Sequence, residues 1–499
     1  MKLLIANRGE IALRIIRTCR KLGVTTVLAY SDPDKESLPL RYADERYPLG
    51  GSTPADTYLN IRKLTRAAKD TGCDAVHPGY GFLSEDAAFV KACVESNLTF
   101  VGPTDSALDK LGNKLLARKT MKEVGVPVIP GSDEPLRDEE DAVSVAEEIG
   151  YPVILKAVYG GGGRGMRIAK TTVDVRRFFR VTRLESLSAF GREAVYVEKR
   201  LKNPRHVEIQ AIADNQGKVV VLGERECSIQ RRHQKLLEEA PSAAVDENLR
   251  SKLNEATSKG LRAAGYTNAG TVEFLLDESK EFFFLEVNKR LQVEHLVTEM
   301  TTGIDIVEEQ LEIASTSTLN LSQNEVKVNG WAINCRINAE DPRRNFAPSP
   351  GTVSEYYAPT GPGIRVDSAL FSGCVVPEYY DSMVAKLAAW GRNRMEAIHR
   401  MRGALEEIEI IGVPTTVPLH RELMHDDRFI EGDFNTTYLN EILPRLTISL
   451  LNLEKFAAVV AAANKLRNPT SIVTSRPDRP ARWRMAARTH HMSTHRQGW

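Results

Sequence analysis

Alternating apolar and polar positions near the N-terminus predict a layer of strands and helices. KLLIAN has the apolar run of a short strand, and GEIALRIIRTCRKLG (9–23) places Ile11 and Ile15 on one face of a helix. TTVLAY, DAVHP and TFVGP predict further short strands with helical stretches between them. Over residues 1–112 this alternation predicts a parallel α/β layer. A Pro-, Gly- and acid-rich stretch, VPVIPGSDEPLRDEE (126–140), then interrupts the pattern.

The middle of the chain predicts two antiparallel hairpins. HVEIQAIA and KVVVLGERE are joined by the short polar turn DNQG. After a predicted helix at about 246–264, GTVEFLLD and EFFFLEVN form a second pair. PVILKA and AVYVEKRL predict additional strands, and WAINCRINAED opens a further mixed segment, residues 329–446.

The stretch EVNKRLQVEH (286–295) continues the second hairpin with unusual polarity. At strand period one face carries Glu286, Asn288, Arg290, Gln292 and Glu294. Glu286 and Asn288 would lie ~7 Å apart, close enough to share one metal–polyphosphate cluster. Glu294 would lie ~26 Å from Glu286 on a straight strand, so the chain must bend after Asn288 if all five share a site. The alternative is a solvent-exposed face.

These residue types suit two different ligands. Hard cations such as Mg²⁺ take carboxylate and amide oxygens, and Glu273 on the partner strand could complete a set with Glu286 and Asn288. Arg290 offers a planar fork for a small oxyanion, and the Glu294 carboxylate could act as a base.

Two other stretches carry candidate chemistry. ILKAVYGGGGRGM (154–166) could bring backbone N–H groups close to phosphates, and its flanking Lys156 and Arg164 favour phosphate binding over a flexible linker. ERECSIQRRHQKLLEEAP (224–241) concentrates positive charge at Arg231, Arg232, His233 and Lys235, among four flanking glutamates. A solvated face of alternating charge explains that run equally well.

Composition narrows the class of protein. The chain has 499 residues, 42% hydrophobic and 27% charged, with a net charge of +1, which is typical of a soluble globular protein of about three domains. This balance gives no reason to expect nucleic-acid or membrane binding. Six scattered cysteines without C-x-x-C predict reduced thiols and a cytoplasmic location. Residues 447–499 are formally +7, and after Asn468 we expect weak folding or disorder.

Seven motifs, in chain order, resemble the biotin carboxylases, the ATP-grasp subunits of biotin-dependent carboxylases. They are ANRGEIA, HPGYGFLSE, GGGGRGM, PRHVEIQ, ERECSIQRRHQK, EVNKRLQVEH and INCRINAEDP, and the resemblance covers residues 1–446. It implies a mixed α/β and α+β fold with a Rossmann-like N-terminal domain (1–112). It further implies an ATP-grasp domain (113–328) with a mobile lid at about 130–204, and a mixed α/β C-terminal domain (329–446). Residues 447–499 form a basic tail.

The resemblance also implies an activity. Members of the family use ATP, Mg²⁺ (or Mn²⁺) and bicarbonate to carboxylate N1 of biotin on a carrier. ATP phosphorylates bicarbonate to carboxyphosphate, which yields CO₂ for capture by the biotin enolate.

By the same resemblance, site residues can be assigned one by one. ATP would be bound by Lys114, Lys156, Gly162, Gly163, Glu198, Lys199, Leu201, His206, His233 and Glu273, with the backbone of 198–201 meeting adenine. The metals would be held by Glu273, Glu286 and Asn288. Bicarbonate would be bound by Lys235, Arg290, Gln292, Val293 and Glu294. Glu294 would be the general base, and Arg336 would stabilise the biotin enolate.

Departures and absences complete the sequence-based expectations. Val158 and Tyr159 replace a small residue and a glycine of the family pattern, and Leu296 replaces a proline. No biotin-attachment motif or carboxyltransferase segment is recognisable, which predicts a separate subunit of a carboxylase of the pyruvate or acyl-CoA type. We expect a homodimer within a larger complex, acting with a biotinylated carrier and a carboxyltransferase subunit. The basic tail could dock an acidic partner or have no role.

Two rival interpretations remain. One is another ATP-grasp ligase, which joins an acyl phosphate to an amine. The other is a nucleotide-binding regulatory subunit without turnover.

Overall fold

The computed structural model describes residues 1–159 and 165–446. The predicted phosphate-binding residues Gly162 and Gly163, Arg164, and the basic tail lie outside the described residues.

The N-terminal part is the parallel layer that the sequence predicts. Five strands in the order β3-β2-β1-β4-β5 pair in parallel. Helix α1 (Gly9–Leu22) buries Ile11 and Ile15, as expected from their spacing. The Rossmann-like expectation is confirmed. The strand without a prediction is β3, whose residues ERYP are mostly exposed and lack an apolar run. The strands are β1 (Lys2–Ile5), β2 (Thr25–Tyr30), β3 (Glu45–Pro48), β4 (Ala75–His77) and β5 (Thr99–Phe100).

An antiparallel sheet of eight strands forms the centre of residues 205–391. Its order is β13-β12-β9-β10-β11-β14-β21-β19. Both predicted hairpins are confirmed: β9 (Arg205–Ala213) pairs with β10 (Val219–Arg231), and β12 (Asn268–Leu276) pairs with β13 (Phe282–Asn288). The predicted helix is α8 (Glu247–Ala264), which packs on the same hydrophobic cluster as β9 and β12.

The sheet continues across the expected boundary at residue 328. β11 (Gln234–Ala240) pairs with β14 (Trp331–Asn338), and β14 pairs with β21 (Met383–Gly391). β21 also pairs with β19 (Ile364–Ser368), which forms the edge of the sheet. β11 escaped prediction because its sequence, QKLLEEA, is dense in charge, although its last five residues are buried. The division of the chain at 328 therefore runs through one continuous sheet.

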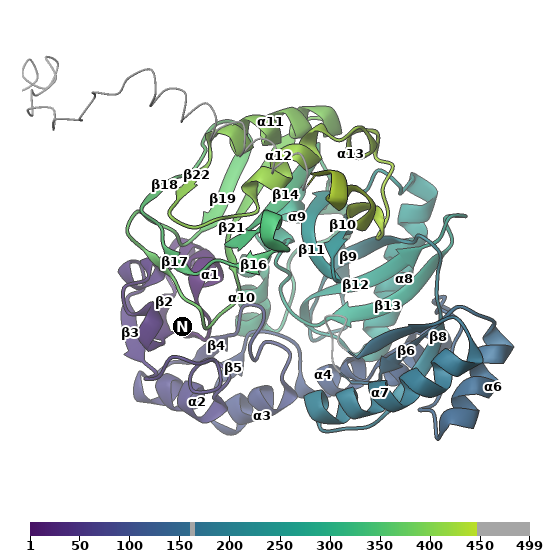
Figure 1. Cartoon of the computed structure of the whole chain (residues 1–499). Helices are drawn as coiled ribbons and strands as arrows, with labels where there is room; N and C mark the ends of the chain where they lie inside the picture. The colour runs from purple at the N-terminus through teal and green to yellow at the C-terminus, as the bar shows by residue number, and fades with distance from the viewer. Residues whose placement is uncertain (160–164, 447–499) are drawn as a thin grey trace, which may run out of the picture. The chain divides into compact units, whose positions relative to one another are not determined.

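A smaller sheet lies within residues 153–199. It contains β7 (Met166–Ala169), β6 (Val153–Ala157) and β8 (Val195–Lys199), in that order. Helices α6 (Glu139–Ile149) and α7 (Thr172–Phe190) pack against it around a separate hydrophobic cluster (Figure 1). This unit lies within residues 130–204, the segment expected to form a lid. Neither helix was predicted.

The remaining elements complete the fold (Figure 1). The helices are α2 (Ile61–Asp70), α3 (Ala87–Glu95), α4 (Asp105–Gly112), α5 (Lys114–Glu123), α9 (His295–Thr302), α10 (Ile306–Thr316), α11 (Arg394–Glu407), α12 (Val417–His425) and α13 (Asp427–Glu431). The short strands are β15 (Glu340–Asp341), β16 (Ala347–Pro348), β17 (Gly351–Thr352), β18 (Glu355–Tyr357), β20 (Val375–Val376) and β22 (Glu409–Ile411). Within residues 1–159 and 165–446, no helix has the length and apolar character needed to cross a membrane. All six cysteines are free thiols.

Candidate active site

The chain bends after Asn288, as it must if both ends of the polar stretch are to share one site. β13 ends at Asn288, and Glu294 directly precedes helix α9, so residues 289–294 form a turn rather than a longer strand. Asn288, Gln292 and Glu294 are buried, which excludes the solvent-exposed alternative for this stretch. The bend lets both ends of the polar stretch face the same region.

Lys235 is the centre of a buried ion cluster. From β11, its ammonium group donates to Glu294 Oε1 (2.7 Å), to Glu273 Oε1 (2.8 Å) and to the Glu208 carboxylate. Arg336, on β14, donates to the other oxygen of Glu294 (2.9 Å) and to Glu238 Oε1 (2.5 Å). The solvated-face interpretation of the run around Lys235 is therefore wrong for this residue.

The cluster controls the ionisation of Glu294. Burial by itself would raise the pKa of this carboxyl, but Lys235 and Arg336, with Arg225 behind them, hold the pKa of Glu294 well below its ordinary value. Burial lowers the pKa of Lys235, but the carboxylates of Glu208, Glu273 and Glu294 outweigh burial and raise it far above its ordinary value. At neutral pH the pair is therefore a carboxylate and an ammonium ion.

Arg225 is a fully buried arginine that contacts this cluster through Glu208. Its side chain on β10 has no exposed surface and donates to Glu208 Oε1 (2.6 Å) and to Gln210 Oε1 (2.7 Å). It also donates to the hydroxyl groups of Thr298 (2.9 Å) and Thr271 (3.0 Å). Because Glu208 accepts from both Arg225 and Lys235, the arginine fixes the carboxylate that orients the lysine.

Arg290 is oriented by groups on both sides of it. Its guanidinium donates to Gln292 Oε1 (2.9 Å), to Asn288 Oδ1 (3.2 Å) and to Glu85 Oε2 (3.2 Å). Glu85, from the N-terminal part, also accepts from the Lys289 backbone N–H (2.9 Å). Burial opposes its ionisation, but Lys289 and Arg290 outweigh burial and lower the pKa of Glu85 to about 2. Glu85 therefore anchors the bend.

Glu273 and Glu286 form the acidic side of the site. They are register partners on β12 and β13, and Asn288 Nδ2 donates to Glu273 Oε1 (2.6 Å). Burial and the neighbouring Glu273 carboxylate raise the pKa of Glu286, so a cation between these side chains would be stabilised. Carboxylate and amide oxygens are the ligands that Mg²⁺ prefers, and these residues fit that ion.

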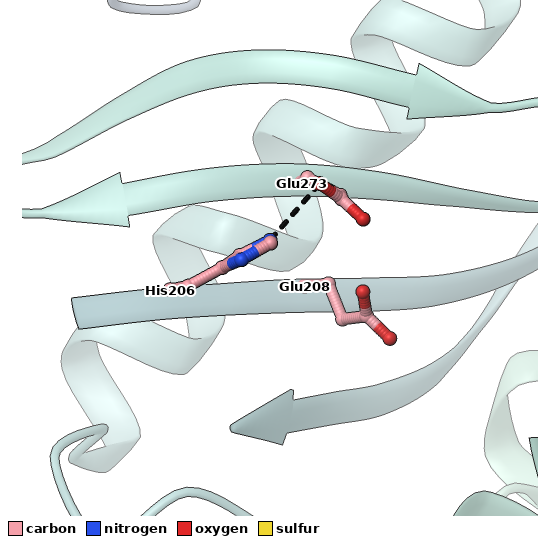
Figure 2. A group of neighbouring side chains, drawn as sticks. All are labelled: His206, Glu208 and Glu273. Carbon is pink, nitrogen blue, oxygen red and sulfur yellow. Dashed lines mark ion pairs between the residues drawn. The ribbon is translucent and has the colours of Figure 1, made fainter. Parts of the chain in front are cut away.

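A second acidic group lies next to this pair. Figure 2 shows His206 and Glu208 on one strand, with Glu273 on its neighbour; the three offer ligand atoms within 4.8 Å of one another. His206 Nε2 lies 3.0 Å from Glu273 Oε2, and Lys235 contacts both carboxylates. Burial lowers the pKa of His206, but Glu273 outweighs burial and raises it. The lysine and histidine supply positive charge here, so the Glu273–Glu286 side is the better place for a metal.

A third set of charges lies between the small sheet and α5. Lys156 on β6 forms an ion pair with Glu198 on β8, which also accepts from Arg118 (2.7 Å). Burial lowers the pKa of Lys114 at the start of α5, with Glu286 opposing and Lys156 reinforcing the effect. His233 is exposed at the hairpin turn, and partial desolvation together with Lys156 lowers its pKa. Lys114 is therefore coupled electrostatically to Glu286 and to Lys156, and Lys156 is coupled to His233.

Three family profiles cover most of the chain in sequence. "Biotin carboxylase, N-terminal domain" matches residues 1–108, "Carbamoyl-phosphate synthase L chain, ATP binding domain" matches 113–322, and "Biotin carboxylase C-terminal domain" matches 334–441. Biotin carboxylase 1 of Bacillus subtilis is 52% identical over 88% of this chain and 98% of its own length. The chain belongs to the biotin carboxylase family.

Solved structures within this family come from different carboxylases. The biotin carboxylase domain dimer of the Hydrogenobacter thermophilus 2-oxoglutarate carboxylase, solved with MgADP, ADP and bicarbonate, is 46% identical. It superposes with a TM-score of 0.87 over 89% of this chain and 98% of the other. The biotin carboxylase component of a pyruvate carboxylase is 48% identical, with a TM-score of 0.77 over 89% of this chain and 98% of the other.

Seven of the residues expected from biotin carboxylases form two contacting groups that Glu273 links. Lys235, Glu294 and Arg336 make direct contacts, as do Arg290, Gln292 and Asn288, and Glu273 touches both Lys235 and Asn288. Val293 enters through its backbone carbonyl, which accepts from Lys386. In the expected adenine segment, the Lys199 N–H already donates to Pro130 O (2.7 Å), and Leu201 follows β8. The roles assigned to these residues remain predictions.

The basic run divides between several environments. Lys235 enters the carboxylate cluster, while Arg231 lies over the Phe346 ring at 3.9 Å and Arg232 is exposed. The flanking Glu224 and Glu226 are buried and paired with Arg250 and Arg205. Strand pairing therefore separates charges that are adjacent in sequence.

Four supporting residues were missed by sequence reasoning. Each lies inside a family motif quoted above or close to one, so the motifs could have pointed to them. The spacing of residues in the sequence, however, does not show which partner each one contacts. The four residues are Glu85, Glu208, Arg225 and Glu238.

The residues that depart from the family pattern are packed. Val158 is buried against Leu115 and Tyr196. The Tyr159 hydroxyl accepts from Asn113 (3.2 Å), and the Arg192 guanidinium lies 4.3 Å from its ring centroid. These contacts tie residues 158–159, which directly precede the glycine run, to α5 and to the segment before β8.

Proposed function

We propose that this chain uses ATP and bicarbonate to carboxylate biotin on a separate carrier protein, through carboxyphosphate. The observation that carries the proposal is the contact of Lys235 with both Glu273 and Glu294. One cation joins the acidic, metal-binding side of the site to the candidate base, so bicarbonate and the terminal phosphate of ATP can meet beside it.

Glu294 has the charge and the position that a general base requires. Glu294 is ionised at neutral pH because its pKa is well below the ordinary value, so it can accept the hydroxyl proton of bicarbonate. A bicarbonate anion that competes for Lys235 relieves Glu294 of one cation and makes the carboxylate more basic. The deprotonated bicarbonate oxygen then attacks the terminal phosphorus of ATP, and ADP leaves as carboxyphosphate forms.

Arg336 serves the second half of the reaction. Carboxyphosphate breaks down to CO₂ and phosphate, and the released phosphate accepts the N1 proton of biotin. The biotin anion then carries negative charge on its ureido oxygen. Arg336 lies against Glu294 (2.9 Å), and its guanidinium would stabilise that charge as it develops. Attack of N1 on CO₂ forms the new N–C bond.

The remaining predicted residues would bind the nucleotide and the metal. Glu273, Glu286 and Asn288 would hold Mg²⁺ or Mn²⁺, which neutralises phosphate charge when bound. Lys114, Lys156, His206 and His233 would contact the phosphates or nucleotide, Glu198 to Leu201 would meet adenine through the backbone, and Gly162 and Gly163 would close over the phosphates. The proposed division remains 1–112, 113–328 with its lid at about 130–204, and 329–446.

Partners are proposed from the relatives' names. Biotin would come on another chain, with a carboxyltransferase subunit that determines whether pyruvate, an acyl-CoA or another acid is the acceptor. A dimer of the 2-oxoglutarate carboxylase domain supports a homodimer for this chain. We also propose a cytoplasmic location, in agreement with its six free thiols.

ADP release by the purified chain tests this function. The assay contains ATP and Mg²⁺, with and without bicarbonate, and with free biotin, biotinylated carrier or neither. Release that needs bicarbonate and rises with biotin is expected. Release that rises with an amine acceptor instead would favour another ligase. ATP binding without release in any mixture, including carrier, would favour the regulatory interpretation and contradict the proposal.

A further inference from the structure

A buried lysine outside the predicted site touches the bicarbonate segment. Lys386, in the middle of β21, has no exposed side-chain surface. Its ammonium group donates to the backbone carbonyl oxygen of Val293 (3.1 Å) and lies 5.6 Å from the centroid of the Tyr80 ring. Lys386 is the register partner of Arg336, so the two cations enter the same region from neighbouring strands.

Two buried carboxylates, Glu10 and Asp367, face the charge of Lys386. Glu10 Oε1, in the first turn of α1, lies 3.1 Å from the ammonium nitrogen. Asp367 is more distant at 3.7 Å, and Arg365 already binds both of its oxygens. Among the residues that the structure describes, neither Glu10 oxygen has a partner of hydrogen-bonding geometry, so the ion pair with Lys386 is its principal interaction.

The contact with Val293 has a defined consequence for Glu294. A trans peptide unit is planar, and its C=O and N–H groups point in opposite directions. Holding the Val293 carbonyl therefore fixes the plane of the peptide that leads into Glu294. It also fixes the direction of the Glu294 N–H and the start of the Glu294 side chain. The neighbouring Gln292 carbonyl is held separately by His295, through Nδ1 at 2.7 Å.

We infer that Lys386 is a positioning residue for bicarbonate: it holds the Val293–Glu294 peptide in its binding geometry, with Glu10 and Asp367 as its buried counter-charges. This inference rests on the proposed function. It adds residues from β21, α1 and β19 to a site whose predicted members come from other segments. Lys386 itself touches the loop backbone and acts through it.

Lys386→Met tests the inference through separate Michaelis constants. It keeps most of the side-chain length but removes the charge and the donor to Val293. The KM for bicarbonate should rise roughly 10- to 100-fold, the loss typical of a charge-assisted hydrogen bond. The KM for ATP should stay within about twofold. A control for the Lys→Met change itself is Lys218→Met, at an exposed lysine that donates to Leu319 O (2.8 Å) in another part of the fold.

The double variant Glu10→Gln/Lys386→Met separates positioning from folding. Lys386→Met leaves the Glu10 carboxylate buried without its partner, so Tm should fall. The double variant removes both charges and should recover most of that Tm. It still lacks the donor to Val293, so its KM for bicarbonate should remain raised. Recovery of both quantities together would show a purely structural role and overturn the inference.

The wild-type protein distinguishes failure of the inference from failure of the function. Bicarbonate-dependent ADP release is measured first, and its absence would remove the proposed function and the inference with it. If wild-type release depends on bicarbonate and folded Lys386→Met keeps the wild-type KM for bicarbonate, the inference alone is wrong.

Discussion

At the scale of residues, the site is a chain of alternating buried charges. Lys235 lies between Glu208 and Glu294, and Arg225 and Arg336 extend the alternation on either side. Burying one charge alone costs several kcal/mol, so each member depends on its neighbours of opposite sign. Residue type and motif were enough to select Lys235, Arg336 and Glu294. They did not identify Arg225 or Glu208. These two residues are recognised as part of the site only through their contacts with side chains on neighbouring strands.

Glu294→Gln keeps the size of the side chain and removes the candidate base. Biotin-dependent ADP release should fall roughly 10²- to 10⁴-fold, which is the usual contribution of a general base. Nucleotide binding, followed by titration, should persist because Glu294 is proposed to bind bicarbonate and not the nucleotide. Glu255→Gln, an exposed acid on α8 paired with Lys259, is the control. Turnover at the wild-type rate in Glu294→Gln would refute the base assignment.

At the scale of elements, the β10–β11 hairpin carries both Lys235 and His233. Arg231 pairs with Gln234, and the two residues between them, Arg232 and His233, both have positive φ (50° and 65°). Such a turn matches the twist of the strands and favours Asn or Gly. Arginine and histidine are poor choices for it. The charges in this run suggested a binding segment, but nothing in their pattern predicted the turn that orients them.

Arg232→Asn should relieve part of this backbone strain. Asn adopts the left-handed conformation more readily, and the free energy of unfolding should rise by roughly 0.5–1 kcal/mol. Urea denaturation measures the change. Nucleotide affinity should be unaltered, since the exposed Arg232 is outside the predicted site. A lower midpoint in urea would contradict this account of the turn.

Helix α10 provides a test of pH dependence. Burial, together with Glu312, Glu308, Asp305 and Glu325, raises the pKa of Glu309 from 4.5 to about 7. The unfolded chain therefore releases this proton at lower pH than the folded chain, and stability is lost as pH rises from 4.5 towards 7.

Glu309→Gln should remove this loss. The variant and the wild-type protein should have similar Tm values near pH 4.5, where the carboxyl is protonated in the folded chain, and the variant should be more stable at about pH 8. Thermal unfolding at both pH values makes the comparison. An advantage of the same size at both pH values would point to packing rather than ionisation.

At the scale of the whole molecule, one sheet joins segments that the sequence divides. Leu237 of β11 pairs with Cys335 of β14, and both belong to one hydrophobic cluster with Ile229 and Leu387. The strand β11 therefore depends on residues beyond 328 for its hydrogen bonds and for burial of its apolar side chains. Arg336 also enters the site from beyond that point.

A fragment ending at residue 328 should fail to fold as a stable unit. Without β14 and β21 it exposes an unpaired strand edge and the apolar side chains of β10 and β11. We expect aggregation, or a circular dichroism spectrum without a cooperative thermal transition, whereas the chain ending at 446 should retain one. A soluble 1–328 fragment with a sharp thermal transition would show that these residues fold independently of the rest of the chain.

The sequence by itself determined the N-terminal parallel layer, the two hairpins and the residue types of the site, and it predicted a bend after Asn288 on the condition that those residues share one site. These follow from periodicity, strand rise and motif order, which are local properties of the chain. The tertiary structure alone decided which charges meet. The Glu85–Arg290, Arg225–Glu208 and Glu10–Lys386 contacts join residues on different elements of the fold. The physical reason is that buried charges are stabilised by partners in space, and strand pairing chooses those partners.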